Sequence, residues 1–148
     1  MENVEWSLPV VFHFLVKIGG AEESFQVVEG LSTSIECEEI RSGGDNSRSF
    51  FLPKHCKHDD LVLKKGFVHK DSIIYEWCKN TFASMNGEIS IETRNVLVSL
   101  LNEKKQPLRT WHFIRAYPYK WSLGSLDAMK NEIAIESISL KYESMSSV

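Results

Sequence analysis

The sequence lacks the features that mark several common classes of protein. Its 148 residues contain three cysteines, Cys37, Cys56 and Cys78, and no C-x-x-C pair. An odd number at wide spacing indicates free thiols in a reducing compartment and not a disulfide framework. Basic residues are not in excess either: 17 Lys and Arg face 20 Asp and Glu, for a net charge of -3. This balance argues against general nucleic-acid binding.

Long hydrophobic runs are also missing. The longest, Leu8 to Val16, is nine residues, includes His13 and has no Lys or Arg before it. We therefore expect no membrane span and no signal peptide, and a protein that folds in the cytoplasm.

Catalytic motifs are equally scarce. No G-x-S-x-G turn is present, and Gly43-Gly44 lacks the Lys of a phosphate-binding loop. The run from His55 through Cys56 and His58 to Asp60 gathers metal-ligand types, but its spacing fits no common zinc motif. We interpret it as a solvated, irregular loop over Pro53 to Asp60, with a metal site as the less favoured alternative.

The strongest positive signal is alternation of apolar and polar residues with a period of two, which is typical of half-buried strands. It is clearest from Leu31 to Arg41, where Ile35 and Cys37 alternate with Glu36 and Glu38. We expect one face of this strand on the core and the other in water. The other predicted strands are 10–18, 24–29, 48–52, 61–67, 94–103, 109–117, 119–121 and 133–142, with a hairpin turn at 104–107.

One segment has a helical period. Apolar residues from Ile73 to Phe82 recur along one stripe, Asp71 or Ser72 can cap the start, and Asn86-Gly87 can end the helix. The fold class predicted is mainly β: an antiparallel sandwich or barrel with one flanking helix. We expect a single domain over residues 1–148, with flexible ends at 1–8 and 144–148.

An aromatic series along residues 111–121 could serve as a core face or as a platform for stacking bases. Its period of two favours the core. The series consists of Trp111, Phe113, Tyr117, Tyr119 and Trp121.

The same stretch resembles the C-terminal signature of the tail tube family, the inner-tube proteins of contractile-tailed phages and related bacterial contractile injection systems. Further blocks agree in order, so the resemblance extends from about Phe12 to Glu143. The shared positions are Trp111-x-Phe113, Ala116-Tyr117-Pro118-x-Lys120-Trp121, Leu126-x-Ala128, Asn131 to Glu136, Leu140, Glu29-Gly30-Leu31, Arg41-x-Gly43-Gly44-Asp45-Asn46, Leu52-Pro53 and Leu61-x-Leu63-Lys64-x-Gly66. The chain departs from the family at His55, Cys56 and His58.

The resemblance implies a structural, non-enzymatic subunit of sixfold rings that stack into a hollow tube inside a sheath, with no cofactor. It implies sheath, baseplate and tube-cap partners, cargo in the lumen, and nucleic acid only as a passenger in a phage. Assembly would take place in the bacterial cytoplasm before the particle is complete. By position, the loop toward the neighbouring ring would be Ser42, Gly43, Gly44, Asp45, Asn46 and Ser47.

In such a ring, the polar strand face would supply a wet, acidic lumen. Its residues are Ser32, Ser34, Glu36 and Glu38. Two alternatives remain at this point: a small-ligand-binding β-barrel, and a metal-using enzyme built on His55, Cys56 and His58.

Overall fold

The computed structural model describes residues 13–41, 43–44, 48–66, 71–83, 91–130 and 134–148. In this part of the chain there are ten strands and one helix. In order they are β1 (His13–Ile18), β2 (Ala21–Phe25), β3 (Val27–Glu29), β4 (Thr33–Arg41), β5 (Ser49–His58), β6 (Leu61–Gly66), α1 (Ile73–Ala83), β7 (Arg94–Leu101), β8 (Pro107–Leu123), β9 (Ile135–Lys141) and β10 (Ser144–Ser147).

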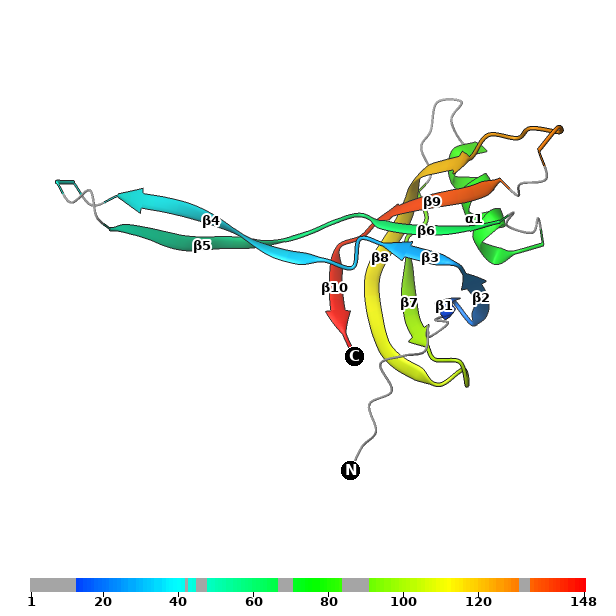
Figure 1. Ribbon diagram of the computed structural model, residues 1–148, viewed down its shortest axis with the longest axis horizontal. Coiled ribbons are helices and arrows are strands. Elements are labelled where there is room, and N and C mark those ends of the chain that lie inside the picture. The colour runs from blue at the N-terminus through cyan, green and yellow to red at the C-terminus, as the bar shows by residue number, and fades with distance from the viewer. Residues whose placement is uncertain (1–12, 42, 45–47, 67–70, 84–90, 131–133) are drawn as a thin grey trace.

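All strand pairs are antiparallel, as the sequence predicts, and eight strands form one continuous sheet in the order β2-β1-β7-β8-β9-β6-β3, with β10 added to β8. The remaining pair, β4 and β5, is a separate two-stranded ribbon that extends far from the body of the molecule (Figure 1). The mainly β class with one helix is confirmed.

The large sheet bends sharply along β8, which contains a β-bulge. Two residues of this strand, Ile114 and Arg115, lie against the single residue Asn95 of β7, where the register shifts. Arg115 has a φ of +51°, and its amide donates to Asn95 Oδ1 at 3.1 Å. A bulge of this kind bends and twists a strand. The first half of β8 therefore pairs with β7 and β10, and the second half pairs with β9.

The segment β2–β3 connects the two ends of the large sheet, because β2 pairs with β1 and β3 pairs with β6. Between β2 and β3, the backbone N–H of Gln26 donates to the carbonyl of Lys64 at 3.0 Å. Lys65 also pairs with Glu23 at 2.6 Å. The two halves of the sheet thus face each other and enclose one core. Its buried members are Val16, Ile18, Phe25, Leu61, Leu63, Ile74, Trp77, Cys78, Val96, Val98, Phe113, Ala116, Ile138 and Leu140.

Helix α1 forms where predicted, and Ser72 is its N-cap: the Ser72 hydroxyl accepts from the amides of Ile74 and Tyr75 at 3.1 and 3.3 Å. The helix buries Ile74, Trp77 and Cys78. The predicted end at Asn86-Gly87 lies outside the described residues.

Three sequence predictions about strands are wrong. The segment from Pro53 to His58 is not an irregular loop but part of β5, because its backbone pairs with β4. Residues 119–121 are not a separate strand but the second half of β8. Residues 144–147 are not frayed: β10 pairs with β8, and Met145 packs against the core. The other end predicted to be flexible, 1–8, lies outside the described residues.

The aromatic series is mainly core, as predicted. Phe113 is fully buried, and Trp111 and Trp121 pack against the core. Trp121 lies against Tyr75 and Phe82 of α1, at ring distances of 5.3 and 6.3 Å.

Candidate assembly surface on the β4–β5 ribbon

The β4–β5 ribbon is solvent-exposed along nearly its whole length. Every residue of β4, and all of β5 except His58, is exposed. Among them are large apolar side chains: Phe50 is 56% exposed, Phe51 64% and Ile35 57%. The sequence prediction that one side of this strand meets the core is therefore wrong beyond Leu31, which does pack against the core. Neither face of the ribbon is covered by its own chain.

The strand register assigns each side chain to a face, because residues directly opposite in an antiparallel pair point the same way. The two faces are named here after Ile35 and Glu36. The Ile35 face carries Thr33, Ile35, Cys37, Glu39 and Arg41 opposite His58, Cys56, Pro53, Phe51 and Ser49. The Glu36 face carries Ser34, Glu36, Glu38 and Ile40 opposite Lys57, His55, Leu52 and Phe50. The register shifts after Glu36, where Lys54 is the extra residue.

The chemistry changes along the ribbon. Near the body, the Glu36 face is polar, and His55 Nε2 lies 2.7 Å from Glu36 Oε2. Toward the tip, Ile40 and Phe50 are apolar on that same face while Phe51 is apolar on the other. Apolar side chains are thus exposed on both faces near the tip, next to the ion pair of Arg41 with Glu39 at 3.6 Å on the Ile35 face. Exposed apolar area of this kind is typical of an interaction surface.

The candidate lumen residues Ser34, Glu36 and Glu38 share the Glu36 face, as the alternation predicts. The face is not purely acidic, however, because Lys57 and His55 lie opposite Ser34 and Glu36. Ser32 is not on the ribbon at all: it precedes β4, and its hydroxyl donates to Asp59 Oδ2.

Of the candidate stacking loop, the structure describes Gly43 and Gly44 only; Ser42, Asp45, Asn46 and Ser47 lie outside the described residues. Both glycines are exposed at the far end of the ribbon. Gly44 has a φ of +95°, and a Cβ at either position would meet no atom within 4 Å.

The residues of the metal hypothesis do not converge. His55 lies on the Glu36 face, whereas Cys56 and His58 lie on the Ile35 face. His58 Nδ1 is 3.3 Å from the hydroxyl of Thr33. Within the described ranges, no group of three or more Asp, Glu, Cys or His residues is arranged to hold a metal ion.

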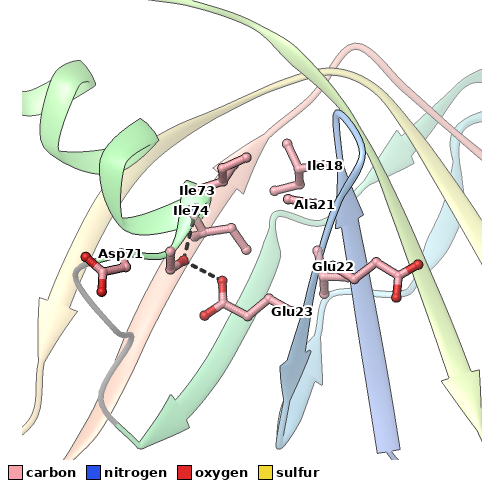
Figure 2. A pocket seen from close by; sticks show the side chains of 9 residues that line it. Ile18, Ala21, Glu22, Glu23, Asp71, Ile73 and Ile74 are labelled. Atoms are coloured by element: carbon pink, nitrogen blue, oxygen red, sulfur yellow. Dashed lines mark hydrogen bonds between the residues drawn. The ribbon is translucent and has the colours of Figure 1, made fainter.

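The small-ligand hypothesis requires a pocket with polar groups that converge on its interior. A hollow of about 500 Å³ lies between the β1–β2 turn and the start of α1 (Figure 2). Its floor includes the buried side chains of Val16, Ile18 and Ile74. Glu23, which points into the hollow, bonds to Ser72 and Lys65 at 2.6 Å each. The Glu23 carboxylate therefore already has two partners within its own chain, which does not favour this hollow as a ligand site.

The ribbon joins the body at a dense group of polar contacts. Asp60 accepts a hydrogen bond from Tyr119 at 2.6 Å and pairs with Lys141 at 3.2 Å. The hydrogen bond from Tyr119 is the main reason that the pKa of Asp60 lies below its ordinary value of 3.8, and Lys141 adds to the effect. The same contacts raise the pKa values of Tyr119 and Lys141.

The apolar tip is not evident from the sequence. The alternation predicts a short strand over residues 48–52, but it does not distinguish an exposed strand from a buried one. Three adjacent apolar residues place bulky groups on both faces of a strand. In a two-stranded ribbon that extends beyond the sheet, this pattern exposes apolar side chains on both faces.

No helix among the residues described is long and apolar enough to cross a membrane.

A comparison with curated proteins found no match. Three solved structures are informative. A chain of the anti-feeding prophage (AFP) baseplate, 6-fold symmetrised, is 27% identical with a TM-score of 0.77, and the match covers 96% of this chain and 95% of that one.

A chain of the PVC sheath-tube complex, from an extracellular contractile injection system in the extended state, is 27% identical with a TM-score of 0.75; the match covers 98% of this chain and 93% of that one. Hcp1 from Flavobacterium johnsoniae, at 13% identity, a TM-score of 0.53 and coverage of 91% and 94%, is similar in fold alone.

The family model described as T4-like virus tail tube protein gp19 matches residues 10–146, which include β1 to β9 and most of β10. This span agrees with the resemblance that the sequence motifs indicate. The chain therefore belongs to the T4-like virus tail tube protein gp19 family and is a structural inner-tube subunit.

Proposed function

We propose that this protein builds the inner tube of a contractile injection system, as sixfold rings stacked inside a sheath. Support comes from the similarity to chains of an injection-system baseplate and of a sheath-tube complex. The observation that carries the proposal is the ribbon, which is uncovered on both faces and exposes the large apolar side chains of Ile40, Phe50 and Phe51 near its tip. Such a surface is costly in a monomer and useful in a polymer.

The occupant of the ribbon surface is further copies of the same chain. A ring closes by cyclic symmetry, whereas a stacking contact between different surfaces does not close and continues as a filament. A ribbon that leaves the body along the longest axis of the molecule (Figure 1) reaches beyond its own subunit. Its tip needs cover on both sides, which two neighbouring subunits can supply. Ring formation itself rests on pairing of the free sheet edges.

The lumen assignment of Ser34, Glu36 and Glu38 is part of the proposal. These groups occupy the polar part of the Glu36 face, which can stay hydrated while the Ile35 face is covered. Sheath, baseplate and cap proteins are the expected partners, and the lumen holds cargo. The mechanism uses no catalytic step: the sheath contracts and drives the rigid tube.

Negative-stain microscopy of the purified chain, alone and with its sheath protein, tests this function. Rings or hollow tubes with sixfold symmetry in end views are the expected result. A monomeric mass by light scattering at high concentration, with neither rings nor tubes when sheath protein is supplied, would contradict it.

The stacking role of the loop 42–47 has its own test. In a Gly43→Val, Gly44→Val variant we expect intact rings but few or short tubes, because the φ of +95° at Gly44 strains a β-branched residue and redirects the loop. The subunit should keep its thermal stability, since neither glycine contacts the core. Tube length by microscopy and ring mass by light scattering measure the two effects. Tubes of normal length, or joint loss of rings and tubes, would contradict the assignment.

A further inference from the structure

The β4–β5 ribbon is a direct extension of the β3–β6 pair, interrupted at one place. Glu29 lies opposite Val62 in the β3–β6 pair, and Thr33 lies opposite His58 in the β4–β5 pair. The two pairs therefore share one register. Between them, residues 30–32 and 59–61 face each other without ladder pairing between them. A two-stranded ribbon without ladder bonds at one point can bend there.

Side chains connect the two strands at this interruption. The Ser32 hydroxyl donates to Asp59 Oδ2, and Thr33 contacts His58 at 3.3 Å. Gly30 brings the backbones close together, since a Cβ at this position would lie 1.8 Å from the carbonyl oxygen of Asp60.

A second set of contacts fixes the same point to the body. Asp60 binds Tyr119 of β8 and Lys141 of β9, and the Lys141 ammonium also lies 4.6 Å from the centre of the Tyr119 ring. Tyr142 donates to the carbonyl of Asp59 at 2.6 Å. The Tyr142 ring in turn packs edge-on against the buried Phe113 at 4.8 Å. The interruption is thus tied through Tyr142 to the core.

We propose that Asp60, with Tyr119 and Lys141, forms a lock that sets the direction of the ribbon in the free subunit, before any other copy binds. This inference deepens the proposed tube function and rests on it for its consequence. A ribbon that is already directed pays less conformational entropy on docking than one that swings about its base. Asp60 acts here as a positioning residue, because it holds the ribbon that is proposed to dock.

Distances within the free subunit test the lock directly. Spin labels are attached at Ser49→Cys near the ribbon tip and Leu108→Cys on the body, in a background carrying Cys37→Ser and Cys56→Ser. Cys78 does not react, because it is buried and burial raises the pKa of its thiol to about 12. We expect a narrow distance distribution for this parent and a clearly broader one after Asp60→Ala or Tyr119→Phe. Glu29→Ala is the matched control, because it removes an ion pair with Lys64, at 3.1 Å, on the body side of the interruption.

Assembly of the otherwise unaltered chain tests the consequence. For Asp60→Ala we expect the concentration needed for tube growth to rise roughly 3- to 10-fold, with an intermediate rise for Tyr119→Phe and none for Glu29→Ala. A purely structural role would instead lower the melting temperature without broadening the distances. Unchanged distance widths in both lock variants would overturn the lock, and broadened distances with normal assembly would overturn its role in docking. Failure of the parent chain to form rings or tubes would contradict the proposed function and leave the distance result to decide the lock.

Discussion

Replacing Phe50 and Phe51 with Ser should abolish tube formation at concentrations where the parent chain assembles fully. The two rings lie on opposite faces of the ribbon tip and are 56% and 64% exposed, so the body of the subunit gains little from them. Phe side chains contribute strongly to the free energy of association at interfaces, because each buries a large apolar area. We expect the concentration needed for assembly to rise by at least about 100-fold. The free energy of unfolding of the single subunit should change by no more than about 0.5 kcal/mol.

Sedimentation of polymer across a concentration series, with thermal unfolding of dilute subunits, measures both quantities. The matched control is Phe50→Leu with Phe51→Leu, which keeps apolar groups on both faces and should retain most of the assembly. Normal tube formation by the Ser variant would show that the tip is not an assembly surface. A large fall in subunit stability would show that the tip serves the fold of its own chain.

Gly30→Ala should destabilise the subunit strongly, more than the same change at Gly19, Gly20, Gly43, Gly44 or Gly124. Gly30 has a φ of +89°, and an added Cβ would lie 1.8 Å from the carbonyl oxygen of Asp60 and 2.8 Å from its carbon. Real structures do not tolerate such contacts, so the β3–β4 and β5–β6 junctions must move apart. We expect a loss of about 2–4 kcal/mol in the free energy of unfolding, from strain and from disruption of the contacts at Asp59 and Asp60.

Gly20→Ala separates the two causes of this loss. Gly20 also has a φ of +89°, but a Cβ there would meet nothing within 4 Å. Gly20→Ala should therefore lower the free energy of unfolding by about 1 kcal/mol, which is the cost of a positive φ at alanine. Urea unfolding of the parent and both variants gives the comparison. Equal losses at the two positions would show that the close approach to Asp60 does not matter.

Period-two alternation in the sequence predicted most of the strands, because a strand must place alternate side chains on opposite faces whatever lies beside it. The single amphipathic segment likewise predicted α1, and its N-cap at Ser72 follows from local hydrogen bonding alone. The succession of motifs predicted the family. These are properties that neighbouring residues determine among themselves, or that many positions carry together.

The fate of each strand face was decided only by the tertiary structure. Ile35 and Val16 have the same alternating pattern, yet Val16 is 1% exposed and Ile35 is 57% exposed. The difference arises because β1 lies between β2 and β7 in the large sheet, whereas β4 pairs only with β5, in a ribbon outside that sheet. A local pattern specifies that a face is apolar, but not which surface covers it. For the same reason, the length of β5 and the grouping of Asp60 with Tyr119 and Lys141 depend on pairings between distant segments, which no local pattern encodes.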